Sequence, residues 1–217
     1  MGRNLMRHLL LLVAAVVLLA GCQEKYEWRQ KMTVVVETPN GDVSGYSVVQ
    51  IFATYNKPPS MVDAYGFKLI GESLTLEIMP DRFLVFVLSG DVGRMYRSAP
   101  DQFVGKRRNE WLAEIPAADF QVTVPTENLP VLVTFSDIQD PNTVTRVDPS
   151  NLAAVFGEGV VLKTVTLEIT DEPITTGGIT KLVDWLDGPM DALVSEVAID
   201  FSEGRGSPLF AYFFVGR

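Results

Sequence analysis

Oxygen donors and cations are the residue types in this chain that could support chemistry or binding. Asp137, Asp140, Asn142 and Asp148 lie close together around the segment Ser-Asp-Ile-Gln-Asp-Pro-Asn-Thr. Ca²⁺ takes carboxylate and amide oxygens as ligands, so these residues form a weak calcium candidate. Their spacing does not match an EF-hand loop, and Asp, Asn and Pro also build tight turns through local hydrogen bonds. The sequence therefore leaves a calcium site and a plain turn as alternatives.

A cluster of cations stands out because the chain as a whole is acidic. Five basic residues fall within one 15-residue window: Arg94, Arg97, Lys106, Arg107 and Arg108. A cationic patch of this kind can bind anionic lipid headgroups, lipopolysaccharide phosphates or an acidic partner protein. In that case we expect Arg94, Arg97 and Arg107 to share one exposed face. The alternative is a solvated loop or short helix in which Glu110 and Glu114 pair with the cations.

Two shorter segments are further candidate sites. Thr175-Thr176-Gly177-Gly178 precedes a helical pattern, and free backbone N–H groups there can hold an anion. The alternative is capping of the helix by Thr176, and no Lys-Ser/Thr pair follows the glycines as a P-loop requires. Asp171-Glu172 follows a predicted strand, where two carboxylates could serve acid–base or glycosidase chemistry or lie in a solvated loop.

The chain lacks the side chains that most catalytic mechanisms need. Its single histidine is His8 and its single cysteine is Cys22. Beyond these positions there is no imidazole or thiol for a Ser-His-Asp or Cys-His system or for a zinc site. The spacings Ser-x-x-Lys and Gly-x-Ser-x-Gly do not occur either. We predict no catalytic residue and no cofactor, and the sequence favours a non-enzymatic role without deciding it.

The N-terminal segment predicts where the protein resides. Arg3 and Arg7 precede an apolar run, Leu9–Ala20, which has the layout of a secretory signal peptide. The run has 12 residues, whereas a transmembrane helix needs about 20. It leads into Leu19-Ala20-Gly21-Cys22, which resembles the lipobox of bacterial lipoproteins. An ordinary cleaved signal, with Cys22 present by chance, is the alternative.

The lipobox resemblance implies a lipid anchor. In that class the signal is cut before the cysteine, whose sulfur receives a diacylglycerol and whose new amino group is acylated. Each buried CH₂ contributes about 0.8 kcal/mol, so several acyl chains on Cys22 hold a protein firmly to a bilayer. Gln23 follows Cys22 where an Asp often signals inner-membrane retention, which favours the outer membrane, facing the periplasm.

Composition limits the classes of partner. Loss of residues 1–21 removes Arg3 and Arg7 from the 18 Lys and Arg, leaving 16 against 27 Asp and Glu, a net charge of −11. This charge disfavours nucleic acid as a partner. The remaining 196 residues are enough for one domain. We expect a signal at 1–21, a tether at 22–30, and one β-rich globular domain at 31–217. Tyr26 and Trp28 in the tether either lie at headgroup level or pack on the domain.

The elements predict an α+β fold with a mainly antiparallel sheet, sandwich or barrel-like, and two to four short helices in the C-terminal half. Strands are expected at Met32–Thr38 and Ser47–Tyr55, joined through an Asn40-Gly41 hairpin turn. Val160–Thr170 alternates as a strand with one buried face, and Phe83–Leu88 is apolar throughout, as a strand covered on both faces is. Helices are expected at 149–157, 179–186 and 190–197.

These observations predict a lipid-anchored envelope lipoprotein that acts as a non-enzymatic binding or scaffold domain. Its expected partners are the membrane, through Cys22, and an envelope protein or anionic envelope component. Two alternatives remain open: a carrier of a small apolar ligand, and a hydrolase of envelope glycans that uses carboxylates alone. The segments Thr33–Gly41 and Val165–Pro173 resemble uncharacterised bacterial envelope proteins, which implies no activity.

Overall fold

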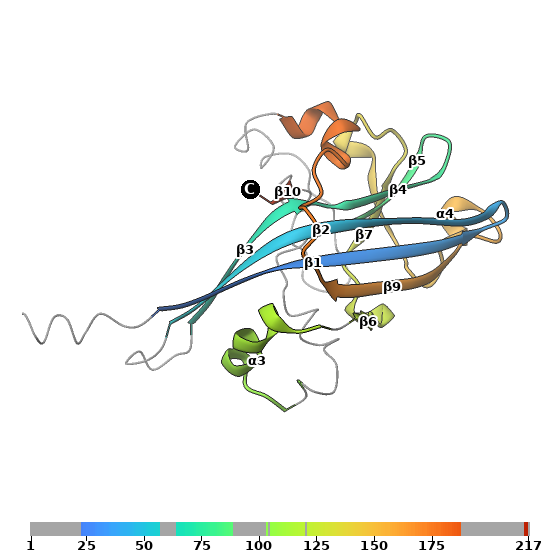
Figure 1. Cartoon of the computed structure of the whole chain (residues 1–217). Helices are drawn as coiled ribbons and strands as arrows, with labels where there is room; N and C mark the ends of the chain where they lie inside the picture. Colours follow the sequence, from blue (N-terminus) through green and yellow to red (C-terminus); the bar gives the residue numbers. More distant parts are fainter. Residues whose placement is uncertain are drawn as a thin grey trace, which may run out of the picture.

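The protein is β-rich, with two antiparallel sheets and few helices (Figure 1). The computed structural model describes residues 23–56, 64–88, 103, 105–119, 121–187 and 215–216. The first sheet has the strand order β10-β3-β2-β1-β9-β6 and the second has the order β4-β5-β7-β8. The strands span Gln23–Thr38 (β1), Gly41–Asn56 (β2), Ala64–Glu72 (β3), Leu74–Met79 (β4), Arg82–Phe86 (β5), Gln121–Thr123 (β6), Leu132–Phe135 (β7), Val144–Val147 (β8), Val161–Ile169 (β9) and Val215–Gly216 (β10).

Strands β1, β2 and β3 form a long antiparallel ribbon, and we use that name for them below. β1 and β2 pair without interruption from Gln23↔Asn56 to Thr38↔Gly41. The hairpin predicted at Asn40-Gly41 is confirmed: Gly41 has φ of 114°, which favours glycine, and the Thr38 hydroxyl donates to the Gly41 carbonyl at 2.7 Å. β3 continues the ribbon beside the far half of β2, from Gln50↔Ile70 to Asn56↔Ala64.

The ribbon differs from expectation at its start. Residues 23–30, expected as a tether, form the first half of β1. The reason is a strand pattern of mixed polarity: Tyr26 and Trp28 face the interior while Lys25 and Glu27 are exposed. Trp28 is 4% exposed and meets Trp111 edge-on with ring centroids 6.4 Å apart. Tyr26 and Trp28 therefore pack on the domain, one of the two alternatives that the sequence left open.

The chain crosses from the first sheet to the second at Gly71-Glu72-Ser73, between β3 and β4. Gly71 has φ of 145°, and a Cβ there would lie 2.8 Å from Val49 Cγ1. Only glycine fits this corner without strain. The Ser47 hydroxyl donates to the Glu72 carbonyl at 2.7 Å, which ties the corner to β2.

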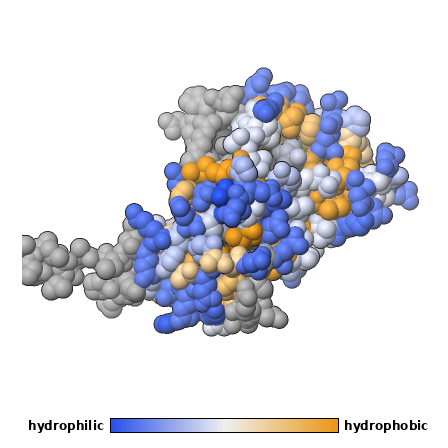
Figure 2. All heavy atoms as spheres, in the orientation of Figure 1, coloured by the Kyte–Doolittle hydropathy of each residue, from blue (hydrophilic) through white to orange (hydrophobic). Residues whose placement is uncertain are grey.

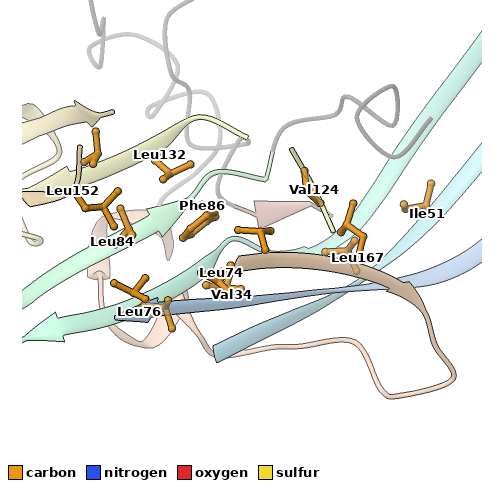
Figure 3. Packing of buried hydrophobic residues seen from close by; sticks show 14 of the residues in the cluster. Val34, Ile51, Leu74, Leu76, Leu84, Phe86, Val124, Leu132, Leu152 and Leu167 are labelled. Carbon is orange, nitrogen blue, oxygen red and sulfur yellow. The ribbon is translucent and has the colours of Figure 1, made fainter. Parts of the chain in front are cut away.

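The main core lies between the two sheets. Figure 3 shows side chains of the first sheet, such as Val34 and Leu167, beside Leu74, Phe86 and Leu132 of the second. In β9 the alternation follows the prediction, since the side chains of Val165 and Leu167 are buried and Glu168 lies on the outer side. Removing non-polar surface from water contributes about 25 cal/mol per Å² to the free energy of folding. This cluster is therefore the main favourable contribution to folding.

The second sheet is covered on both faces, as the apolar run at 83–88 predicts. Leu84 and Phe86 face the main core, while Val85 and Val87 belong to a separate cluster with Ile179 and Val183. That second cluster forms because residues 175–187, which we call the strap, cross the outer face of the sheet. The strap is held there partly by Trp185, whose Nε1 donates to the Ile138 carbonyl at 2.9 Å.

Helical segments in the described residues are short. They are α3 (Arg108–Glu114), α4 (Ala153–Phe156) and 3₁₀ turns η2 (Ile115–Ala117), η3 (Thr126–Asn128), η4 (Pro141–Thr143), η5 (Ile179–Lys181) and η6 (Asp184–Asp187). The helix expected at 149–157 is shortened to α4, which Gly157 ends with φ of 101°. The helix expected at 179–186 was wrong in type, because the strap follows the sheet as two 3₁₀ turns. The helix expected at 190–197 lies outside the described residues.

None of the helices among the described residues combines the length and the hydrophobicity needed to cross a bilayer.

Candidate functional site

The basic window of the sequence lies at the start of α3. Lys106, Arg107 and Arg108 are described, whereas Arg94 and Arg97 lie outside the described residues. The predicted common face of Arg94, Arg97 and Arg107 therefore stays a prediction.

The described cations of this window contact carboxylates and a ring. Arg107 Nη2 lies 2.6 Å from Glu110 Oε1, and Glu110 Oε2 accepts the Arg107 backbone N–H at 3.1 Å. The hydrogen bonds from the Arg107 side chain, and then from its backbone, hold the pKa of Glu110 below its usual value. Lys106 pairs with Glu114. These ion pairs are the ones expected if the basic window is a short helix whose cations are neutralised by Glu110 and Glu114.

Arg108 joins α3 to the ribbon. Its guanidinium lies 5.2 Å from the centroid of the Tyr65 ring on β3, which in turn stacks on Tyr55 of β2 with centroids 4.9 Å apart. A cation over an aromatic face contributes about 0.5–1 kcal/mol at an exposed site. The contact therefore places one positive charge of the window at the end of the ribbon.

The acidic loop of the calcium candidate is built as a set of turns. Asp137 Oδ1 accepts the Gln139 backbone N–H at 2.9 Å, and Asp140 Oδ1 accepts the Asn142 backbone N–H at 2.9 Å. Each carboxylate thus serves its own turn, as the alternative hypothesis states.

Asp148 belongs to a separate turn of the same kind. It accepts the Ser150 hydroxyl at 2.7 Å, and this bond and the Ser150 backbone N–H lower the pKa of Asp148. Within the described ranges, no group of three or more His, Cys, Asp or Glu residues comes together to hold a metal. The calcium site stays a prediction that the described geometry does not support.

An anion does occupy the glycine segment that precedes the strap turns, and it belongs to the chain itself. The carboxylate of Glu72 accepts the backbone N–H of Gly177 at 2.7 Å and that of Gly178 at 2.8 Å. It also accepts the Thr180 hydroxyl at 2.9 Å. Free N–H groups at such a turn favour negative charge. The predicted capping by Thr176 is not among the hydrogen bonds of the described residues, whereas Glu72 satisfies these donors.

The neighbouring residues position Glu72 for this role. Glu72 ends β3, is 6% exposed, and its backbone is held by Ser47. Thr175 ties the start of the strap to β2, because its N–H donates to the Val48 carbonyl at 3.0 Å and its hydroxyl accepts the Val48 N–H at 2.9 Å. A buried carboxylate with several donors anchors the strap to the sheet corner. Sequence analysis missed Glu72, since the partners are 105 to 108 positions apart.

The carboxylates at the end of β9 take part in ion pairs with β1. Lys31 Nζ lies 2.5 Å from Glu172 Oε1 and 3.5 Å from Glu168 Oε1. The hydrogen bond to Glu172 is the main cause that raises the pKa of Lys31. Asp171 is fully exposed and lies 3.6 Å from Arg29. The pair Asp171-Glu172 is thus split between two cations and does not converge on a common point.

A small cavity lies between the sheets, next to Glu72. Its volume is about 80 Å³, and Met32, Val49, Leu69 and Phe86 supply apolar walls. Gln30 Oε1 is buried at its lining and accepts no hydrogen bond within the described part of the chain. Pockets for drug-sized ligands have about 300–1,000 Å³, so this cavity is suited to water rather than to a large apolar molecule.

Comparison with family models, with curated proteins and with solved structures gives no match. The functional argument therefore depends on the chain's own residues. Fold alone does not assign activity, because one fold supports many functions. In the described residues, the carboxyl groups whose pKa is clearly shifted, Glu110 and Asp148, are shifted downward. A general acid requires the opposite shift.

Proposed function

We propose that the protein is a lipid-anchored lipoprotein of the bacterial cell envelope, held by acyl chains on Cys22. The observation that carries this proposal is the tetrapeptide Leu19-Ala20-Gly21-Cys22 directly after a positively charged and apolar segment. The folded domain starts close to the proposed anchor, because Gln23, the residue after Cys22 in the sequence, already belongs to β1. Gln23 after the cysteine favours the outer membrane, with the domain in the periplasm.

We infer that the anchored domain binds or supports another envelope component and is not an enzyme. The support is chemical: no imidazole or thiol follows Cys22 in the sequence, and the described acidic clusters serve turns and ion pairs. The partner is an envelope protein or an anionic envelope component. We also propose that the two sheets form a sandwich or barrel-like fold, with two to four short helices in the C-terminal half of the chain.

The two alternatives have weaker support. A carrier of an apolar ligand needs a cavity of several hundred Å³, whereas the cavity beside Glu72 measures about 80 Å³. A glycan hydrolase that uses carboxylates alone needs two of them across a cleft, about 5–9.5 Å apart. Asp171 and Glu172 are instead paired with Arg29 and Lys31.

The experiment is metabolic labelling of the full chain in a bacterium with an alkyne fatty acid. We expect label on the parent protein and none on Cys22→Ser, and mass spectrometry of the N-terminal peptide then shows an acylated Cys22 without residues 1–21. An inhibitor of the lipoprotein signal peptidase should cause the uncut lipidated form to accumulate. Recovery of the parent from the cytosol with Met1 present and the sulfur unmodified refutes the proposal.

The membrane in which the protein resides is tested separately. Gln23→Asp should move the labelled protein from the outer-membrane fraction to the inner-membrane fraction, while Lys25→Asp, two positions further on, should leave it in place. If the parent and Gln23→Asp distribute in the same way between the two membrane fractions, outer-membrane sorting through Gln23 is refuted, but lipidation is not.

A further inference from the structure

The lipid anchor and the fold meet without a spacer. The first residue after Cys22 is Gln23, which is already paired with Asn56 in the antiparallel ribbon. A residue in a paired strand has little backbone freedom. If Cys22 is acylated, as proposed above, the end of the ribbon therefore lies at the bilayer surface, and the inference below rests on that proposal.

The ribbon is stiff enough for the position of its anchored end to set the orientation of the whole domain. At the anchor end three strands pair, since β1, β2 and β3 run side by side over residues 23–29, 50–56 and 64–70. Helix α3 supports one face of this end through the edge-on contact of Trp28 with Trp111. In Figure 1 the ribbon projects to the left beyond the second sheet, while the β1–β2 hairpin lies at the opposite end. The two ends of β1 thus lie at opposite ends of the described part of the chain.

The anchor end combines packed aromatic rings with a polar surface. Tyr26, whose hydroxyl donates to Glu24 at 2.6 Å, lies near the stacked rings of Tyr55 and Tyr65 in adjacent strands. These rings pack against the core, with Tyr55 only 6% exposed, and they hold the three strands together at this end. Figure 2 shows this end as mostly hydrophilic, which fits contact with headgroups and not insertion into the hydrocarbon.

Cations lie on both faces of the ribbon at this end. Lys25 and Lys68 are exposed on β1 and β3, and the exposed Arg108 lies over Tyr65. Lys and Arg close to an anionic membrane surface are attracted to it. Glu24 and Glu27 are the acidic residues of this part of β1, and Glu110 and Glu114 of α3 are cancelled by their partners Arg107 and Lys106. Among the described residues the anchor end therefore has three further cations against two carboxylates, in a chain that is strongly acidic.

The hairpin end of the ribbon carries a negative net charge. Acidic residues there outnumber the cations Arg82 and Lys163. They lie in the β1–β2 hairpin, the β4–β5 turn and the loop before β9: Glu37, Asp42, Glu77, Asp81 and Glu158. Figure 1 places these three connections on the right, away from the start of β1. An anionic surface repels this end and attracts the other, which turns the molecule upright.

We propose that the end of the ribbon, residues 23–28 with the adjoining parts of β2, β3 and α3, is a membrane-contact surface that seats on anionic lipid headgroups and holds the domain upright. Lys25 and Glu37 lie on the same strand and the same face, twelve residues apart. At about 3.3 Å per residue they differ in height above the bilayer by about 40 Å. The acidic hairpin end then faces away from the membrane.

The test uses the single cysteine of the chain. Acylation converts the Cys22 sulfur into a thioether, so Lys25→Cys and Glu37→Cys each supply one free thiol for a maleimide fluorophore. The full lipidated proteins are reconstituted in vesicles of phosphatidylethanolamine and phosphatidylglycerol that contain a lipid with a nitroxide on its headgroup. We expect quenching several-fold stronger at position 25 than at position 37. Equal quenching at both positions, or none at either, overturns the proposal.

The role of charge is tested by a double variant with a matched control. Lys68→Glu with Arg108→Glu, in the Glu37→Cys background, should raise the quenching at position 37 towards that at position 25, whereas Lys163→Glu at the opposite end should leave it low. Unchanged quenching in the double variant refutes headgroup recognition by these cations. Mass spectrometry of Cys22 separates the two proposals: an unacylated chain overturns both, and an acylated chain with uniform quenching overturns only the upright contact.

Discussion

The contact between Glu72 and the strap leads to the most specific stability prediction. The perturbation is Glu72→Ala, which leaves the donors of Gly177, Gly178 and Thr180 without their acceptor. A hydrogen bond to a charged group contributes about 1.5–3 kcal/mol, and a buried donor left without an acceptor costs about 1–3 kcal/mol. Because the donors are partly buried and gain some hydration, we expect a loss of about 3–5 kcal/mol in the free energy of unfolding.

The assay is denaturant unfolding of the purified protein followed by tryptophan fluorescence, together with amide hydrogen exchange. Glu72→Gln has the same shape but presents an NH₂ group toward a donor, so its loss should be smaller, about 1–3 kcal/mol. Thr180→Val removes one donor and should cost about 1 kcal/mol. In all three variants the amides of the strap should exchange faster than those of β1, since the strap opens first.

The refuting result is equally specific. If Glu72→Ala unfolds within about 0.5 kcal/mol of the parent, the size expected of an ordinary surface substitution, the contact does not anchor the strap. Loss of stability without faster exchange at Gly177 and Gly178 also contradicts the reasoning, because the effect would then arise elsewhere.

Three further perturbations have defined outcomes. Gly71→Ala should cost about 2–4 kcal/mol in denaturant unfolding, because φ is 145° and the new Cβ would lie 2.8 Å from Val49 Cγ1. Burial, and then the hydrogen bond to Glu24, raise the pKa of Tyr26 to about 12. In an absorbance titration one tyrosine should therefore ionise at higher pH than the others, and this step should be missing in Tyr26→Phe. The neutral Tyr26 stabilises the fold below the ordinary tyrosine pKa, and this contribution is lost as pH rises toward 12. Lys31→Met should lower the melting temperature at neutral pH, and its effect should shrink as pH rises through the raised pKa of Lys31.

Each of these has a contradicting outcome. Gly41→Ala controls for backbone strain alone, because Gly41 has φ of 114° but open space around its Cα. If Gly71→Ala costs no more than Gly41→Ala, the contact with Val49 is not responsible. A Tyr26→Phe variant with an unchanged titration curve contradicts the assignment to Tyr26, and an effect of Lys31→Met that is constant with pH contradicts a role for its charge.

The parts of the fold that could be predicted are those in which a local pattern decides the structure. Asn40-Gly41 defines the hairpin because glycine tolerates positive φ, and the apolar run containing Val85 and Phe86 indicates a strand buried on both faces. The first half of β1 was mistaken for a tether, because polar Glu24 and Gln30 share the inner face with its aromatic residues. A strict alternation of polar and apolar residues is thus absent where the face is only half buried.

The site depends on contacts between distant residues, which a local pattern does not contain. The sequence predicted that Gly177-Gly178 could hold an anion, but the anion is Glu72, which lies before a corner more than a hundred positions earlier. The strap bends into 3₁₀ turns for a similar reason, since Ile179 and Val183 follow the sheet surface of the second cluster. The pairing of Glu110 with Arg107 could be predicted because it is local.

Coverage of the second sheet by the strap has a consequence for how the protein survives in a compartment that contains proteases. Val85, Val87, Val133 and Phe135 form a flat apolar face that is dry only while Ile179 and Val183 lie on it. A single cut within residues 175–187 would bare this face and create a surface prone to self-association. Nicked molecules should therefore accumulate as aggregates, so that integrity of one short segment decides solubility for the whole domain.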